Sequence, residues 1–517
     1  MKMDVTEAFS HSGFGRFQFK YPLPLIGGGN LFIAFNMCLG IFTLYENKEP
    51  TEENPNPIKI YSVSEEFQLT DFEAKFINSC LMFGVLAGNF LIGKLADSYG
   101  RRTIGLILVP FTIGTMVAST FLTFDWVSYA IWRFLHGVMN GGLGVSMTVL
   151  SLELVENSYW SYLCCAGAGI FGIGLAILAV LARIFNTWRG LTFITSLPNL
   201  YLVYVVYKMP ESPRWLYSIG RFAEAETIMQ DIAETNGSDP RFRLKKPREA
   251  HPSGDVSMTS SFNENVAHNE AQNSNPQNAN LLDTSNTKES GLDIFKSKPT
   301  RTRLLAMVIT WFSASLIYYG LTLGAGDLGD NVYQSTAYSG FSELPGYVLT
   351  IIMMEQSYFG RKRTAMIFYS FTFIFMVLID IFDLNGKSKL ILALSAKMLI
   401  SGAFAIIYTY CCELFPTTVR SVGLGWSSMS ARIGGILAPF AVQLGALIRE
   451  NDENSGFLFY SIFAVMSTLV LILIPETLNG QIHDNIKSLE RSSSRRGRIE
   501  DGGLLGDNIE SVGLLED

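Results

Sequence analysis

Twelve long apolar runs divide this 517-residue chain, and they limit its fold more than any other feature. They lie at 23–45, 76–97, 103–124, 127–152, 160–184, 190–208, 303–325, 333–355, 364–383, 389–412, 421–448 and 456–475. Each is close to the roughly 20 residues that cross a hydrocarbon layer about 30 Å thick. Backbone polar groups have no water to bond inside a bilayer, so we expect every run to be helical. The sequence therefore predicts an all-α membrane protein with twelve transmembrane helices.

The chain also contains an internal repeat. The loop after the second run reads Gly-Lys-Leu-Ala-Asp-Ser-Tyr-Gly-Arg-Arg at 93–102, and its Gly-Arg core returns 260 positions later, at 360–361. A glutamate follows each core glycine by 53 residues, as Glu153 in the first copy and Glu413 in the second. Matched halves in a membrane chain are typical of transporters whose binding site lies between the repeats.

Basic residues indicate the orientation in the membrane. They lie in short loops that fall on one side if the helices alternate, as Lys94, Arg101, Arg102, Arg361, Lys362, Arg363 and Arg420. By the positive-inside rule that side is the cytosol, so we expect both termini there. The loop at 46–75 is rich in glutamate and aspartate. It is expected to face the outside or a lumen.

These expectations divide the chain into five parts. They are a cytosolic N-terminus at 1–22, an N-terminal six-helix bundle at 23–208, a cytosolic linker at 209–302, a C-terminal six-helix bundle at 303–475 and a cytosolic tail at 476–517. Apolar residues at helical spacing predict short helices at the start of the linker. From 237 to about 290 the linker is rich in Asn, Ser, Pro and Gln, which predicts disorder.

The sequence offers no support for an enzyme. Hydrophobic residues make up 48% of the chain and charged residues only 16%, as expected for a protein embedded in lipid. All six cysteines lie in or at the end of apolar runs, and no histidine or second cysteine pair has metal-ligand spacing. We find neither a nucleotide-binding loop nor an evident catalytic triad. We therefore expect no metal, no cofactor and no nucleic-acid partner.

The repeated loop resembles the signature of the major facilitator superfamily, in which twelve helices form two six-helix bundles. The resemblance implies that Asp97 can lie at the N-terminus of a helix of the other half, and that Arg101 can pair with Glu153. In the second copy Ser357 replaces the aspartate, with Glu355 two residues earlier, so we expect unequal gates. The alternative is that these are loop charges obeying the positive-inside rule. The residues expected to form the cytosolic gate are Asp97, Gly100, Arg101, Glu153, Glu211, Arg214, Gly360, Arg361, Glu413 and Arg420.

Four further strings, in order, are similar to the organic cation, anion and zwitterion transporter family of solute carriers. They are Pro-Glu-Ser-Pro-Arg-Trp-Leu at 210–216, Tyr-Tyr-Gly-Leu at 318–321, Glu-Leu-Pro at 343–345 and Glu-Leu-Phe-Pro-Thr-Thr-Val-Arg at 413–420. The first outer loop departs from the animal members, in which it is long, cysteine-bearing and glycosylated. Here it has neither cysteine nor glycosylation sequon.

An arginine inside the eleventh run gives the best indication of substrate charge. Arg432 lies twelve residues past Arg420, which places it roughly 18 Å into the bilayer at about 1.5 Å per residue. A charge at that depth costs at least ~2.5 kcal/mol, so it should face a cavity and a counter-charge. The resemblance implies an anion or zwitterion carrier, because cation carriers of the family typically have aspartate there. Arg432 is interpreted as a clamp for a carboxylate, sulfate or phosphate, or else as a structural ion pair with Glu343.

Other intramembrane residues complete the expected pocket. The resemblance implies that Tyr318, Tyr319 and Phe404 line the cavity, where their rings accept flat organic groups and cations; packing is the alternative. Lys397 could supply a second positive charge, or serve helix packing or a gate. One of two asparagines in the first run should face the cavity. The residues expected to bind substrate are Arg432, Tyr318, Tyr319, Phe404, Glu343, Asn36 and Lys397.

Two polar residues of the fourth run, Arg133 and His136, admit two interpretations. A histidine titrates near physiological pH and could relay a proton during transport. The local string is instead similar to a structural arginine site of facilitator proteins.

The tail carries two acidic dileucine patterns, which end at Leu504 and Leu505 and at Leu514 and Leu515. Such patterns indicate delivery by clathrin adaptors to endosomes, lysosomes or a vacuole. The plasma membrane is the alternative location.

Together these features predict a secondary transporter for small organic ions, with anions or zwitterions preferred, working by alternating access in a lipid bilayer. Two alternatives stay open. One is an organic cation transporter of the same family. The other is a non-transporting vesicle or signalling protein of the same fold.

Overall fold

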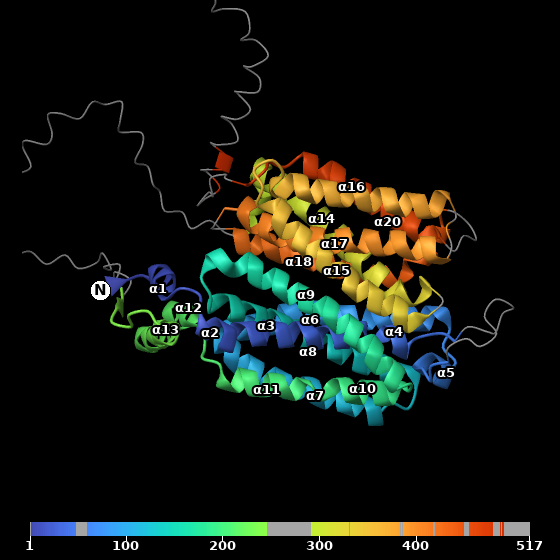
Figure 1. Cartoon of the computed structure of the whole chain (residues 1–517), viewed down its shortest axis with the longest axis horizontal. Helices are drawn as coiled ribbons and strands as arrows, with labels where there is room; N and C mark the ends of the chain where they lie inside the picture. The colour runs from blue at the N-terminus through green and yellow to red at the C-terminus, as the bar shows by residue number, and fades with distance from the viewer. Residues whose placement is uncertain are drawn as a thin grey trace, which may run out of the picture.

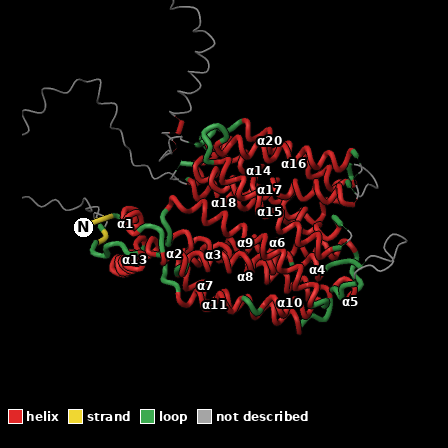
Figure 2. The backbone as a smooth tube through the Cα atoms, in the orientation of Figure 1, coloured by secondary structure: helices red, strands yellow, loops and turns green. Residues whose placement is uncertain are grey.

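The computed structural model describes residues 2–47, 59–245 and 291–478, apart from 330, 383, 385, 417, 418 and 449–453, together with 486, 489 and 490. Figure 1 shows two helical bundles side by side, one from each half of the chain. The backbone trace in Figure 2 places the short strands beside the N-terminus, at one end of the N-terminal bundle. The described chain is helical as predicted.

The N-terminal bundle contains α3 (Pro22–Cys38), α4 (Gly40–Thr43), α6 (Asp71–Tyr99), α7 (Arg101–Phe121), α8 (Trp126–Glu153), α9 (Trp160–Ile184), α10 (Trp188–Ser196) and α11 (Asn199–Lys208). The first predicted span is divided at Leu39, between α3 and α4. The sixth is divided before Asn199, where Pro198 has no backbone N–H to continue the helical ladder. Helix α5 (Val63–Phe67) lies in the loop between α4 and α6.

The C-terminal bundle contains α14 (Lys298–Leu323), α15 (Val332–Met354), α16 (Gly360–Ile381), α17 (Gly386–Leu414), α18 (Arg420–Leu437), α19 (Ala441–Ala446) and α20 (Ser455–Ile472). The short turns η4 (Gly324–Asp327) and η5 (Ala438–Phe440) extend α14 and α18. The eleventh predicted span is thus α18, η5 and α19 in succession.

A small layer of structure covers one end of the N-terminal bundle (Figure 1). It consists of β1 (Lys2–Met3), α1 (Val5–Ser12), α2 (Arg16–Lys20), η1 (Asn157–Tyr159), α12 (Pro213–Ser218), α13 (Phe222–Asn236) and β2 (Arg243–Leu244). Strand β1 pairs in parallel with β2, with Lys2 opposite Arg243. The turn η3 (Gly291–Phe295) precedes α14. The helices predicted at the start of the linker are therefore present and hold the N-terminal segment.

Nine helical segments of the described chain are long and apolar enough to cross a membrane. Three predicted spans, those that contain α8, α15 and α18, are not among them. These three helices carry the polar intramembrane residues Arg133, Glu343 and Arg432. The count of twelve transmembrane helices therefore stays a prediction.

Glycines allow the closest helix contacts. Within the N-terminal bundle, a Cβ on Gly84 of α6 would collide with the Phe134 carbonyl oxygen, and one on Gly137 of α8 with the carbonyl of Leu81. Between the bundles, a Cβ on Gly340 of α15 would collide with the carbonyl oxygen of Gly172 of α9. Because neither glycine has a side chain, the backbones of α9 and α15 meet directly.

Candidate substrate site and gates

A fully buried ion pair lies inside the C-terminal bundle. Lys397 of α17 is 1% exposed and Glu343 of α15 is 0% exposed, and Nζ lies 3.2 Å from Oε1. The hydroxyls of Tyr318 and Tyr347 each donate to the carboxylate at 3.0 Å. Lys397 also donates to the Ser339 hydroxyl. Each charge is thus paired and hydrogen-bonded, which offsets the desolvation penalty of burying it.

Arg432 of α18 has a different environment. Its side chain is half-buried, and no carboxylate oxygen of the described residues lies within 4.0 Å of it. The Tyr319 and Tyr408 hydroxyls both lie close enough to interact with its charge. Glu343, the partner considered from the sequence, is engaged by Lys397 instead. Arg432 therefore retains an unneutralised positive charge beside two tyrosines.

One polar neighbour of Arg432 comes from the opposite bundle. When the Asn89 amide on α6 is oriented to donate to the Gly141 carbonyl at 2.9 Å, its oxygen accepts from Arg432 Nε at 3.1 Å. The contact joins α6 and α18 across the interface. Asn89 is not among the residues predicted from the sequence, because an isolated amide in an apolar helix carries no signal of what it faces.

Aromatic rings extend from the ion pair toward Arg432, as a cluster of Trp311, Tyr318, Tyr319, Phe404 and Tyr408. The centroids of Tyr318 and Tyr319 are 5.3 Å apart, and those of Tyr318 and Phe404 6.0 Å. Trp311 lies 4.3 Å from Tyr408 and 6.0 Å from Phe404. The structure thus brings the three predicted aromatics together and adds two. Trp311 could have been found from its spacing, since two turns of α14 place it on the same face as Tyr318.

Asn36 makes its described hydrogen bonds inside the N-terminal bundle. Its Nδ2 donates to Asn140 Oδ1 at 3.1 Å, and its carbonyl accepts from Arg133 Nη1 at 3.0 Å. Arg133 is 0% exposed. The carbonyl belongs to the last turn of α3, where a positive charge is favourable. Arg133 therefore supports the division between α3 and α4, in keeping with the structural interpretation of the fourth run.

The repeated loop at 93–102, named the first gate loop after its predicted role, forms a three-residue charge cluster within its own half. Arg101 Nε lies 3.1 Å from Glu153 Oε2, and Arg101 Nη2 lies 3.0 Å from Asp97 Oδ1. Asp97 is 75% exposed and Arg101 only 12%. In this structure Asp97, near the end of α6, pairs with Arg101, the first residue of α7.

The second gate loop, around 360–363, repeats this charge cluster with Glu355 in place of the aspartate. Arg361 Nε lies 3.2 Å from Glu413 Oε1, and Arg361 Nη2 lies 3.6 Å from Glu355 Oε1. Glu355 thus occupies the place of Asp97, although it is offset in sequence. The second of these pairs is longer than its counterpart, in the direction of the expected inequality.

One further carboxylate binds backbone N–H groups of each gate loop. Glu211 accepts from the backbone N–H groups of Arg101 and Arg102 at 3.1 Å. Glu476 accepts from those of Arg361 and Lys362 at 2.9 and 3.0 Å. These N–H groups begin α7 and α16, where helices leave donors unpaired and favour negative charge.

Glycine is required in front of both carboxylates. Gly100 has φ +99° and Gly360 has φ +63°, values that other residues rarely adopt. A Cβ on Gly100 would collide with Glu211, and one on Gly360 with Glu476. The repeated glycine therefore lets each carboxylate reach the start of a helix.

Arg214 of α12 and Arg420 of α18 are the remaining predicted gate residues. Arg214 Nη2 donates to Asn157 Oδ1 at 2.8 Å, and its guanidinium stacks over Phe9 at 4.8 Å and Trp160 at 5.6 Å. Burial lowers the pKa of Arg214, and the Glu153 carboxylate opposes that shift. Arg420 is the first residue of α18. The sorting residues Leu504, Leu505, Leu514 and Leu515 lie outside the described residues.

The opposite ends of the bundles contact each other directly. The Tyr333 hydroxyl of α15 donates to Asn186 Oδ1 at 3.0 Å, and its ring stacks on Phe42 of α4 with centroids 5.7 Å apart. Two more hydrogen bonds cross between the halves, from Gln443 to Asp71 at 2.8 Å and from Ser79 to the Ile436 carbonyl at 2.7 Å. These contacts join the two halves at the end that carries α5, whose place is seen in Figure 1.

Two helical bundles with repeated gate loops define a transporter of the major facilitator type. The family described as "Sugar (and other) transporter" matches residues 12–486, and the chain belongs to that family. A relative from Xenopus laevis, "Solute carrier family 22 member 15-like", is 33% identical over 94% of this chain and 96% of its own length. "Organic cation/carnitine transporter 4" from Arabidopsis thaliana is 27% identical over 83% and 76%.

The fold itself is similar to that of a solved transporter. A partially occluded inward-open structure of the xylose transporter XylE from E. coli matches with a TM-score of 0.63 at 17% identity, covering 90% of this chain and 99% of that one. The predicted superfamily, the solute-carrier resemblance and the all-α membrane fold are thereby confirmed. The cytosolic position of the termini stays a prediction.

Proposed function

We propose that this protein moves small organic anions or zwitterions across a membrane by alternating access, and that Arg432 binds the anionic group. The observation that carries the proposal is the contrast between two cations beside one aromatic cluster. Lys397 is neutralised by Glu343 at 3.2 Å. Arg432 has no carboxylate within 4.0 Å among the described residues.

The charge balance limits the substrate. One unneutralised guanidinium matches one anionic group, which favours a monocarboxylate or a zwitterion over a dianion. A guanidinium can also form two parallel hydrogen bonds to a carboxylate, sulfate or phosphate. The adjacent rings of Tyr319 and Tyr408 would hold the organic part of the substrate or a cationic group.

The gates support the transport cycle. Cross-bundle contacts close the end with Tyr333 and Asn186. At the opposite end, the ion pairs of Arg101 and Arg361 each lie within one half. Basic loops favour the cytosol for that end. We therefore assign this structure to a state closed on the outer side.

The direct test is uptake by Arg432→Gln in proteoliposomes, with labelled anions, zwitterions and cations. Loss of a charge-assisted bond should lower anion or zwitterion uptake about 10- to 100-fold. Arg432→Lys keeps the charge but loses the fork and should be intermediate. Arg301→Gln, at the exposed start of α14, is the matched control. Uptake restricted to cations and unchanged in Arg432→Gln would refute the assignment.

An organic cation transporter is the second candidate. The names of the Arabidopsis relative and of a Drosophila melanogaster relative both contain the words "organic cation". The aromatic cluster could bind a cation through its ring faces. The Arabidopsis name also includes carnitine, which bears a carboxylate beside its quaternary ammonium. In this alternative, removing the like charge of Arg432 should leave cation uptake equal or higher. Absence of flux for every compound would instead favour a non-transporting protein.

We also propose delivery to an endosomal, lysosomal or vacuolar membrane through the two dileucine patterns of the tail. A combined Leu504→Ala, Leu505→Ala, Leu514→Ala and Leu515→Ala variant should then accumulate at the plasma membrane. Microscopy of a tagged chain measures this. An unchanged distribution would show that neither these leucines nor clathrin adaptors that bind them direct the protein to its membrane.

A further inference from the structure

The N-terminal segment 2–20 forms a clasp on α12 and α13. Strand β1 pairs with β2, which follows α13 in the chain. The Asn236 side chain at the end of α13 donates to the Ser12 and Gly13 carbonyls at 3.1 and 3.0 Å and accepts from the Phe17 N–H at 2.9 Å. Residues before the first span and after the sixth are thus held together.

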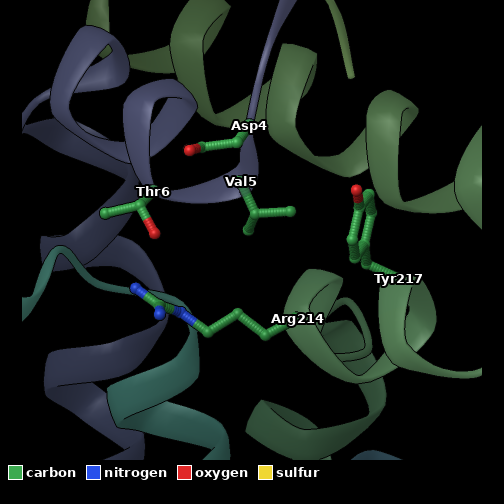
Figure 3. Close-up of a pocket in the computed structure, with 5 residues that line it drawn as sticks. All are labelled: Asp4, Val5, Thr6, Arg214 and Tyr217. Carbon is green, nitrogen blue, oxygen red and sulfur yellow. The ribbon is translucent and has the colours of Figure 1, made fainter. Parts of the chain in front are cut away.

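An open surface depression of about 320 Å³ lies where the first turn of α1 meets α12, and it is lined by Asp4, Val5, Thr6, Arg214 and Tyr217. In Figure 3 the Thr6 hydroxyl points toward the Arg214 guanidinium across this space. Asn157 accepts a hydrogen bond from Arg214 Nη2, while Nε is buried and has no partner among the described residues. The depression therefore places an arginine guanidinium opposite an exposed hydroxyl.

The two exposed hydroxyls of α1 face opposite charges. Thr6 faces Arg214, whereas the Ser10 hydroxyl donates to Glu156 Oε1 at 3.0 Å. Phosphorylation adds about −1.5 to −2 charges and three acceptor oxygens. A phosphate on Thr6 would meet a guanidinium, and a phosphate on Ser10 would meet a carboxylate.

We propose that Thr6 is a phosphorylation site at which Arg214 binds the phosphate and fastens the clasp. A protein kinase transfers the γ-phosphoryl group of a nucleoside triphosphate. The Thr6 Oγ–P bond forms, the β–γ P–O bond breaks, the hydroxyl proton passes to a base of the kinase and a nucleoside diphosphate leaves. The proposal rests on the orientation given above, with this end of the protein in the cytosol.

The local charges fit a phosphate at this position. Thr6 lies in the first turn of α1, where negative charge is favoured by the unpaired N–H groups. Glu7, the adjacent acid, has Lys245 Nζ at 3.3 Å. Asp4 is an opposing carboxylate in the lining, and it already accepts from the Glu7 N–H at 2.7 Å. Arg214 is thus the cation available to a phosphate on Thr6.

The test compares full-length protein with genetically encoded phosphothreonine at 6, phosphoserine at 10, or neither, by amide hydrogen exchange of α1. Phosphothreonine should slow exchange about two- to fivefold, as for a partly exposed ion pair. Phosphoserine at 10 should accelerate it. In an Arg214→Gln background the slowing by phosphothreonine should become smaller, and the difference isolates the pairwise effect.

Two results would overturn the proposal. One is acceleration by phosphothreonine at 6, or slowing that is equally large in the Arg214→Gln background. The other comes from the tryptic peptide 3–16 of the chain expressed in eukaryotic cells, if Thr6 is unmodified while other sites of the chain carry phosphate. Because amide exchange needs no substrate, either failure is distinguishable from failure of the transport proposal.

Discussion

At the scale of single residues, the intramembrane charges have separate tasks. Lys397 and Glu343 neutralise each other inside the C-terminal bundle, with two tyrosines and a serine completing their hydrogen bonds. Arg133 is bound to a helix carbonyl in the N-terminal bundle. Arg432 lies at the interface between the bundles, where Asn89 of the opposite half reaches it. A substrate anion would therefore meet one cation.

Glu343→Gln should destabilise the protein strongly. It would leave Lys397 buried without its counter-charge, and breaking a buried pair from one side costs about 3–5 kcal/mol. The thermal unfolding midpoint in detergent, together with the monodisperse fraction on gel filtration, measures the loss.

The double variant Glu343→Gln with Lys397→Met is the control. Removing both charges should recover much of the stability, because no lone charge is left. If the pair serves packing, the double variant should also transport. A stable double variant that has lost uptake would instead make the pair part of the substrate site.

At the scale of helices, the contact between the halves depends on small residues. Gly172 of α9 and Gly340 of α15 bring two backbones together, and Glu343 lies one turn further along α15. A contact without side chains lets two helices shift without rotamer changes. It is therefore suited to a joint between moving bundles.

Gly340→Ala should impair this joint. Its Cβ would collide with the Gly172 carbonyl, and overpacking of this kind costs about 1–3 kcal/mol. We expect a lower unfolding midpoint and slower turnover. Gly114→Ala in α7 is the matched control, because no described atom lies within 4 Å of the position its Cβ would take. Equal behaviour of the two variants would count against a tight α9–α15 contact.

The sequence predicted single helices better than it predicted their partners. The run at 160–184 coincides with α9, because apolar length alone marks such a helix. The Arg101–Glu153 pair followed from the superfamily resemblance. The Lys397–Glu343 pair was missed, because it depends on which faces of α15 and α17 meet. The same limit hid Asn89, and the division at Leu39 depends on Arg133 from another helix.

At the scale of the whole molecule, the two ends differ. One end is joined across the bundles by Tyr333, Asn186 and Phe42. The other holds its ion pairs within each half. Alternating access requires the joined end to separate in each cycle.

Fixing the joined end should stop transport. In Asn186→Cys with Tyr333→Cys, a short bifunctional thiol reagent should abolish uptake, and reductive cleavage of a disulfide-containing linker should restore it. Each single variant treated in the same way is the control and should remain active. Full uptake by the cross-linked double variant would mean that this end does not open.

The carboxylates of Glu211 and Glu476 have one more consequence. Glu211 follows α11 and binds the start of α7, and Glu476 follows α20 and binds the start of α16. The end of each bundle is therefore hydrogen-bonded to a helix near its beginning. Hydrogen bonds thus join the early and late parts of each half, and the clasp adds a second such connection in the N-terminal half. The residues that make these connections belong to the half itself or to the segment directly after its last helix. Each half is therefore held together by its own contacts, as a separate subunit would be, although both belong to one chain.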